Sequence, residues 1–268
     1  MDVLWQWGLG LIATMQSGRT PILDAVFRAF TFLGEEQFYL LLFPTLLWCV
    51  DAKLGFRLGG LVLISFYVNS LLKDAIGHPR PFDFDPSVKI MDAEGYGLPS
   101  GHAQSAALVW GGVAVHAQKR WMWAVALALA GMIGLSRVYL GAHFPTDVLG
   151  GWGIGAVLLV AGSALYLWAG DRFKRRSLAA QIALAIAAPA LLGLLFPDPS
   201  AISAMGALAG LGAGGVLSMR YLRVTPEGPG WQRGLRLVVG LAVLFVLYVG
   251  LRLLIPDGEA RLHLVMRA

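Results

Sequence analysis

The chain alternates long apolar runs with short polar connections, and the apolar runs predict membrane-spanning helices. A helix that crosses a bilayer needs about 20 mostly apolar residues, with a range of about 17–25. Runs of this kind occupy residues 35–51, 56–72, 103–118, 121–140, 147–168, 178–196, 201–218 and 235–255. We therefore expect an all-α integral membrane protein with about eight spans.

Two shorter segments, 2–16 and 20–33, precede the first run. The second carries Asp24 and Arg28 four positions apart, on one helix face, and is too short and too charged to span comfortably. We expect both segments to be helices lying in the membrane interface, with Trp5 among the interfacial aromatic residues.

Composition supports a membrane protein. Residues of the AVILMFWYC set make up 57% of the 268 positions, charged residues only 14%, and the mean hydropathy is +0.67. Soluble domains carry roughly 25% charged residues, so this chain lacks the polar surface to cover a water-soluble globule. The net charge of +5 is a weak excess that argues against a nucleic-acid partner. Cys49 is the only cysteine, which excludes an intrachain disulfide and a thiolate metal cluster.

The charges of the connecting loops predict the orientation. With eight spans, one set of helix ends carries most of the basic residues, among them Lys53, Lys119, Arg120, Arg175 and Arg233. The positive-inside rule places these ends in the cytoplasm. The less basic ends, including loops 73–102 and 136–147, then face the periplasm, the cell exterior or an organelle lumen.

Three polar clusters fall on this less basic side. They are Lys73-Asp74-Ala75-Ile76-Gly77-His78-Pro79-Arg80-Pro81, then Leu98-Pro99-Ser100-Gly101-His102, then the stretch from Ser136-Arg137 through His143 to Asp147. Because the spans alternate in direction, all three clusters meet at one membrane surface.

The first chemistry these clusters predict is anion binding. Lys73, Arg80 and Arg137 supply three cations, and a guanidinium binds a phosphate bidentately. Ser100 and Gly101 begin a helix, where free backbone N–H groups and the helix dipole attract an anion. The site is therefore suited to phosphate, sulfate or vanadate.

The second chemistry is phosphoryl transfer. His143 and Asp147 lie four apart and share a face if Pro145 sits in the first turn of the helix. The carboxylate then holds one imidazole nitrogen as N–H and leaves the other bare, which makes His143 a nucleophile. His102, at the helix start, is suited to protonate a leaving oxygen and later to deprotonate water.

Each cluster alone also fits a structural role. Basic side chains at span ends often only snorkel to the interface, and Ser100 alone could be a plain helix cap. His78 and Tyr96 adjoin the site and are candidates to touch the substrate, but packing is the role we expect for both. Acidic residues of the outer loop, Asp83, Asp85 and Asp92, are interpreted as solvated rather than as ligands of a divalent ion. Snorkelling and helix capping do not explain why all three clusters occur in this order on one predicted face, which favours a functional site.

The three clusters resemble the signatures of the type 2 phosphatidic acid phosphatase superfamily, also called PAP2 or lipid phosphate phosphatases. The resemblance implies a six-helix PAP2-like core with extra C-terminal transmembrane helices, no metal and no cofactor. It implies that His143 forms a phosphohistidine, Asp147 orients it, and His102 acts as acid and then base. The residues implied to hold the substrate phosphate are Lys73, Arg80, Ser100, Gly101 and Arg137.

The domain organisation predicted from spans and resemblance has three parts: interfacial helices over 1–34, a catalytic core over 35–170, and a transmembrane extension over 171–268. The segment that begins Gly34-Glu35-Glu36 is similar to the sphingosine-1-phosphate phosphatase branch, although both glutamates also suit a simple helix N-terminus.

The expected substrates are sphingoid-base phosphates, phosphatidate, phosphatidylglycerophosphate or polyprenyl diphosphates, with membrane lipids as the surroundings. Two alternatives remain open from the sequence. One is a phosphotransferase that uses the same site. The other is a non-catalytic protein that binds or transports phospholipids. The oligomeric state is left undetermined.

Overall fold

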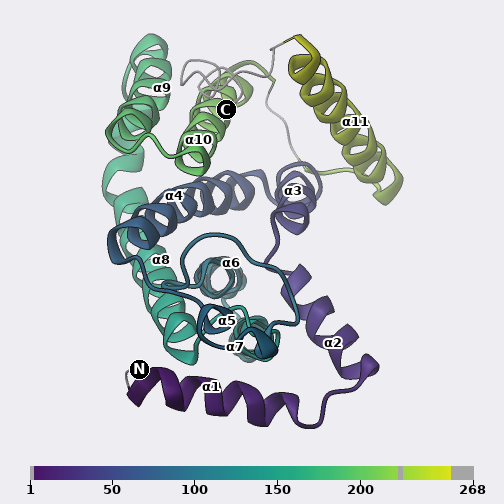
Figure 1. Ribbon diagram of the computed structural model, residues 1–268. Coiled ribbons are helices and arrows are strands. Elements are labelled where there is room, and N and C mark those ends of the chain that lie inside the picture. Colours follow the sequence, from purple (N-terminus) through teal and green to yellow (C-terminus); the bar gives the residue numbers. More distant parts are fainter. Residues whose placement is uncertain (1–2, 223–225, 255–268) are drawn as a thin grey trace. The chain divides into compact units, whose positions relative to one another are not determined.

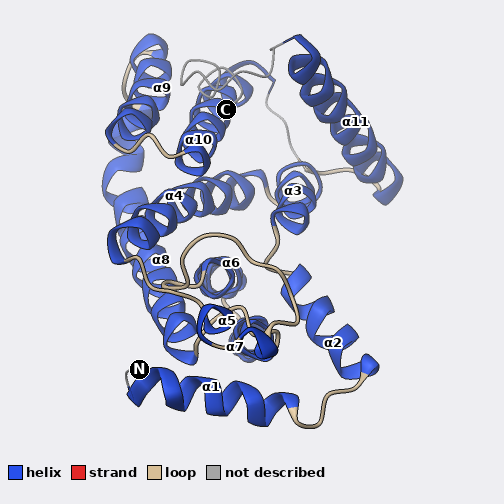
Figure 2. Cartoon of the chain, viewed as in Figure 1, coloured by secondary structure: helices blue, strands red, loops and turns tan. Residues whose placement is uncertain are grey.

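The computed structural model describes residues 3–222 and 226–254, and over these ranges it contains helices and loops but no strand (Figure 2). The α-helices, labelled in Figure 1, are α1 (Val3–Gln16), α2 (Pro21–Phe32), α3 (Glu36–Thr45), α4 (Ala52–Ile76), α5 (Pro81–Phe84), α6 (Gly101–Ala117), α7 (Arg120–Tyr139), α8 (Pro145–Lys174), α9 (Leu178–Leu195), α10 (Pro199–Leu217) and α11 (Gly230–Leu254). Three short segments, not labelled there, are the π-helical η1 (Leu46–Val50) and η3 (Ser218–Leu222) and the 3-10 turn η2 (Pro86–Val88).

The helices confirm an all-α, multi-pass membrane protein. Six of them are long and apolar enough to cross a bilayer, and they coincide with six of the eight predicted runs. The run predicted over 35–51 is a shorter apolar helix, Glu36–Val50, and that over 103–118 is α6, with 17 residues. The last run, 235–255, falls in α11, with residue 255 outside the described residues.

The chain divides into two compact units. Unit 1 comprises Met1–Tyr39 and Val68–Gly162, and unit 2 comprises Leu40–Tyr67 and Ser163–Ala268. Every site residue expected from the sequence belongs to unit 1. The three-part division at 34/35 and 170/171 stays a prediction, and its C-terminal part includes 223–225 and 255–268, which are outside the described residues.

Unit 1 is built around α6, whose residues from Ala103 to Ala114 are mostly buried. Glycines on one face of α8 allow a close approach: a Cβ at Gly151 would lie 2.5 Å from the Ser100 carbonyl oxygen, and one at Gly155 would lie 2.3 Å from that of Gln104. Small residues spaced four apart bring helix backbones together in this way. The contact sets the start of α8 directly against the start of α6.

Within unit 1, helices α1 and α2 both pack against α7. Thr20 caps α2 by accepting the Leu23 N–H, and Pro21 follows at the first helical position. Phe27 of α2 stacks on Tyr139 at the end of α7, with ring centroids 4.2 Å apart. On α1, Ile12 is fully buried. The two predicted interfacial segments are therefore helices, and their position in the membrane interface stays a prediction.

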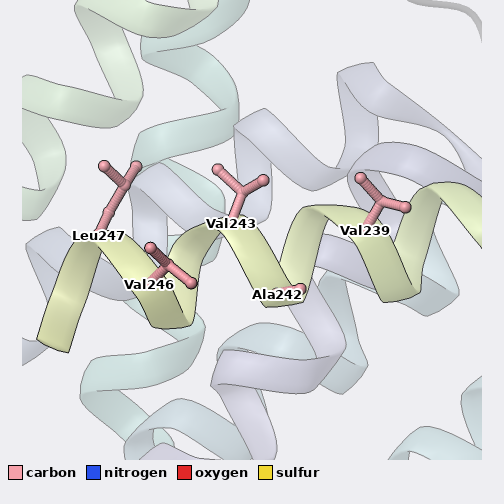
Figure 3. Close-up of a pocket in the computed structure, with 5 residues that line it drawn as sticks. All are labelled: Val239, Ala242, Val243, Val246 and Leu247. Carbon is pink, nitrogen blue, oxygen red and sulfur yellow. The ribbon is translucent and has the colours of Figure 1, made fainter. Parts of the chain in front are cut away.

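Unit 2 pairs α9 with α10, and α11 with η1. The Cys49 thiol donates to the Arg233 carbonyl at 3.2 Å, and a Cβ on Gly240 would overlap the Trp48 ring. A pocket on α11 is lined, among the described residues, by the aliphatic side chains of Val239, Ala242, Val243, Val246 and Leu247 (Figure 3). This lining offers no group for phosphate chemistry.

Candidate active site

The loop between α7 and α8 positions His143. Gly141 has φ +71°, and a Cβ there would meet the Val88 carbonyl oxygen at 2.0 Å, so this turn requires glycine. The N–H groups of Ala142 and His143 both donate to the Arg137 carbonyl, at 3.0 and 3.2 Å. The loop thereby folds back on the end of α7 and leaves His143 only 2% exposed.

Asp147, in the first turn of α8, lies beside His143 as the spacing predicts. Its Oδ2 is 3.5 Å from His143 Nδ1 and accepts the Phe144 N–H at 2.9 Å. Its backbone carbonyl accepts the Ser100 N–H at 3.0 Å, which ties the loop that carries His143 to the start of α6. The carboxylate is completely buried.

The other ring nitrogen of His143 faces a guanidinium. Arg80 Nη1 lies 3.3 Å from His143 Nε2. Because arginine only donates hydrogen bonds, Nε2 is the acceptor, and the proton of the neutral ring sits on Nδ1, toward Asp147. Burial lowers the pKa of His143 well below its ordinary value, and the charges of Arg137 and Arg80 lower it further. The resting ring is therefore neutral at pH 7, as a nucleophile must be.

Arg80 also organises the surrounding loops. Its Nε donates to the Gly95 carbonyl at 2.7 Å, Nη2 to the Glu94 carbonyl at 2.5 Å, and Nη1 to the Ala142 carbonyl at 2.8 Å. Its backbone N–H donates to Asp83 at 2.7 Å. The sequence predicted that Arg80 binds the substrate phosphate. In the structure its guanidinium also donates hydrogen bonds to three backbone carbonyl oxygens.

The start of α6 presents an anion-binding arrangement. Ser100 is completely buried, and among the described residues its hydroxyl has no hydrogen-bond partner. Asn69 of α4 holds this turn by donating to the Pro99 carbonyl at 3.2 Å and to Gln104 at 2.9 Å. A Cβ at Gly101 would lie 3.1 Å from the Asn69 side-chain oxygen, so the turn packs tightly on α4.

The remaining cations approach from α4 and α7. Arg137 is buried, and its Nη1 donates to Thr31 at 2.7 Å, while within the described part of the chain its Nε has no partner. Lys73, in the last turn of α4, is half-buried and close enough to interact electrostatically with Arg80, Arg137 and Asp147. The three cations expected from the sequence thus surround one buried centre.

His102 has a carboxylate partner that the sequence did not assign. Glu35 Oε1 lies 3.2 Å from His102 Nε2 and 4.0 Å from Arg137 Nη1. The contact with His102 holds the pKa of Glu35 below its ordinary value. A Cβ on Gly34 would lie 2.7 Å from His102 Cδ2, so this edge of the ring is covered and Nδ1 is on the opposite edge.

His78 also has an unexpected neighbour: its Nδ1 lies 3.3 Å from Asp147 Oδ1. All eight site residues predicted from the sequence therefore come together in unit 1, and Glu35 and His78 join them. Glu35 was interpreted as a possible helix-end charge and His78 as a packing residue, because neither contact follows from sequence spacing. The described residues include no group of three or more His, Cys, Asp or Glu side chains placed to hold a metal ion.

The cluster combines the neutral His143 imidazole, whose Nε2 carries no proton, with the Asp147 carboxylate next to Nδ1. Three cations, the start of α6 and the His102 imidazole complete it. Phosphoryl transfer is promoted mainly by positioning and by charge neutralisation, and these groups supply both.

Comparisons with known proteins agree with this chemistry. Residues 54–174 match the PAP2 superfamily, and residues 202–268 match the family described as "PAP2 superfamily phosphatase, transmembrane extension". Sphingosine-1-phosphate phosphatase 2 of Mus musculus is 34% identical over 143 residues, which cover 50% of this chain and 40% of that protein. The chain thus spans less than half the length of this relative.

Bacterial relatives are covered more fully. Phosphatidylglycerophosphatase B of Bacillus subtilis is 34% identical over 157 residues, which cover 52% of this chain and 73% of that protein. The crystal structure of a transmembrane PAP2-type phosphatidylglycerolphosphate phosphatase from Bacillus subtilis superposes with a TM-score of 0.53 and 25% identity, covering 66% of this chain and 90% of that one. The chain therefore belongs to the PAP2 superfamily.

Proposed function

We propose that the chain is an integral membrane phosphatase that removes phosphate from phosphorylated lipids through a phosphohistidine at His143. The observation that carries this proposal is the buried placement of His143, with Nδ1 toward Asp147 and Nε2 facing Arg80. A phosphate bound by Arg80 arrives beside the bare nitrogen. Membership of the PAP2 superfamily supports the same chemistry.

In the first step, Nε2 of His143 attacks phosphorus, the N–P bond forms, and the bond from phosphorus to the lipid oxygen breaks. Protonated His102 gives its proton to that oxygen, releasing the lipid alcohol. Because Nε2 of His102 faces Glu35, we assign this transfer to Nδ1. Burial and the charge of Arg137 lower the pKa of His102, and the Glu35 carboxylate opposes them by favouring the protonated form.

In the second step, neutral His102 takes a proton from water as the water oxygen bonds to phosphorus and the N–P bond breaks. Inorganic phosphate leaves, and His143 returns to its neutral form. Arg80, Arg137, Lys73 and the N–H groups at the start of α6 offset the negative charge on the phosphoryl oxygens in both steps.

The proposed substrate class is a lipid phosphate monoester or diphosphate whose head group reaches unit 1 while its chains stay in the bilayer. Two relatives are named for sphingosine-1-phosphate and phosphatidylglycerophosphate, which supports this class. We propose that the site opens on the extracytoplasmic face, on the basis of the loop charges. Cysteine introduced at exposed Tyr96, in a Cys49→Ser background, should then react with an impermeant maleimide added outside cells.

The decisive experiment measures phosphate release by the purified protein, with EDTA present, from sphingosine-1-phosphate, phosphatidate, phosphatidylglycerophosphate and undecaprenyl diphosphate. We expect turnover of at least one substrate and its loss in His143→Ala, while the matched control His116→Ala, at an exposed histidine, keeps its activity. Activity that persists in His143→Ala would remove the nucleophile. Binding without turnover across the panel would favour the non-catalytic alternative, and transfer to a labelled alcohol would identify a phosphotransferase.

A further inference from the structure

We infer that His78 and Trp5 are positioning residues that act on His143 through Asp147, so that α1 takes part in orienting the nucleophile. This inference rests on the proposed function, since it concerns the same site. The contacts of three side chains carry it: the Trp5 indole, the His78 imidazole and the Asp147 carboxylate.

The first step is the tautomer of His78. Trp5 Nε1–H donates to His78 Nε2 at 3.0 Å. An indole nitrogen only donates, so Nε2 of His78 must be an acceptor, and the proton of the neutral ring is on Nδ1. That nitrogen lies 3.3 Å from Asp147 Oδ1. Trp5 therefore makes His78 a donor toward the carboxylate.

The second step is that the two carboxylate oxygens of Asp147 have different partners. Oδ1 faces His78, whereas Oδ2 accepts the Phe144 N–H and faces His143 Nδ1 at 3.5 Å. Neither imidazole contact is aligned as a full hydrogen bond, which is common in catalytic sites before substrate binds. Because buried Oδ1 makes no full hydrogen bond with the described residues, the attraction of the His78 N–H at 3.3 Å is what offsets its desolvation. Removing His78 therefore frees the carboxylate to rotate away from His143.

The third step is that α1 is held firmly enough to place Trp5. A Cβ on Gly8 would lie 2.6 Å from the Phe144 ring, so the helix backbone lies directly on the residue that follows His143. The Gln16 amide donates to the carbonyls of Val88 and Tyr139 at 2.9 and 2.8 Å. The Trp5 ring packs on Phe84, with centroids 4.5 Å apart. Both ends of α1 are thus attached to the loops around the site.

The matched variants separate positioning from packing. His78→Leu removes both nitrogens at similar volume, and His78→Asn keeps a side-chain N–H near the position of Nδ1. Trp5→Phe removes only the indole donor. Trp7→Phe, on the same helix and 52% exposed, is the control.

The measurement is kcat and KM for lipid phosphate hydrolysis by each purified full-length variant, with thermal unfolding in the same detergent. We expect His78→Leu to lower kcat by about 10–100-fold, by analogy with residues that hydrogen-bond and orient the ligands of metal sites, with KM changed less than about threefold. His78→Asn should restore most of the lost kcat. Trp5→Phe should lower kcat by about threefold and add nothing to His78→Leu, because residues in one network are not additive.

Wild-type kcat in folded His78→Leu would overturn the inference, as would multiplicative losses in the double variant or an equal loss in Trp7→Phe. If His78→Leu does not fold, Trp5→Phe alone decides: an unchanged kcat contradicts the inference. Failure of the proposed function gives a different result, because the wild-type protein then turns over no lipid phosphate, or His143→Ala stays active.

Discussion

Among the described residues of unit 1, the histidine–carboxylate pairs His143–Asp147 and His102–Glu35 differ in how they are assembled. His143 and Asp147 come from one short stretch at the start of α8, and both are at most 2% exposed. His102 and Glu35 come from the start of α6 and the residue before α3, with side chains 19% and 27% exposed. The proposed nucleophile is thus enclosed, while the proposed proton carrier lies nearer the surface.

The difference fits the two roles in the proposed mechanism. A nucleophile needs a neutral ring in one tautomer, and burial among cations keeps His143 neutral. A proton carrier must exchange protons between turnovers, which partial exposure allows. The variants below test whether the two pairs differ in this way.

The largest effect is expected for Asp147→Asn. The amide cannot hold the Nδ1 proton as a carboxylate does, and the wrong tautomer of His143 becomes available. By analogy with the carboxylate of a Ser-His-Asp triad, kcat should fall by about 10³–10⁴-fold. Phosphate release from a lipid substrate measures it, with Asp92→Asn, at an exposed loop position, as the control. A loss below tenfold would show that the pair does not set the tautomer.

A smaller and more selective effect is expected for His102→Asn. Loss of a general acid typically costs about 10²–10⁴-fold, but only where the leaving oxygen needs a proton. The variant should therefore lose most of its activity on an alkyl lipid phosphate and keep much more on an aryl phosphate with an acidic leaving group. His143→Ala should lose both. Equal losses on the two substrates in His102→Asn would contradict its role as the acid.

The smallest effect is expected for Glu35→Gln, which keeps the shape and removes the charge. A nearby carboxylate raises the pKa of a histidine by favouring its protonated form. Without it, protonated His102 is lost at lower pH, so the alkaline limb of the kcat–pH profile should move down by about one unit. Arg137, 4.0 Å from Glu35, and Lys73 are the cations among the described residues that act on His102, and both lower its pKa. Glu36→Gln, at the exposed neighbour, should leave the profile unchanged.

Much of the fold could be predicted from the sequence because the bilayer imposes a length on apolar helices. Six predicted runs coincide with span-length helices, and the other two are shorter helices. The pair of His143 and Asp147 was equally predictable, because both lie in one turn of chain before and within α8. Short-range geometry of this kind depends on backbone dihedrals alone.

The contacts of Arg80 could not be predicted in the same way. Its three carbonyl partners come from two separate loops, one with Glu94 and Gly95 and the other with Ala142, and the paths of these loops depend on helix packing. Glu35 and His78 were likewise visible in the sequence, but their partners lie on other helices. Trp5 fits an interfacial aromatic residue by its sequence, and only its hydrogen bond to His78 reveals another role.

The sequence by itself determined a membrane protein of apolar helices and the local pairing of a histidine with an aspartate, and it predicted that three polar clusters meet. Only the tertiary structure decided which carboxylate faces His102, which donor stands behind Asp147, and which helix holds that donor. The physical reason is the sequence distance over which each effect acts. The length of an apolar run and the periodicity of a helix depend only on neighbouring residues. The direction of a side-chain hydrogen bond between distant segments is set by how closely the helix backbones pack.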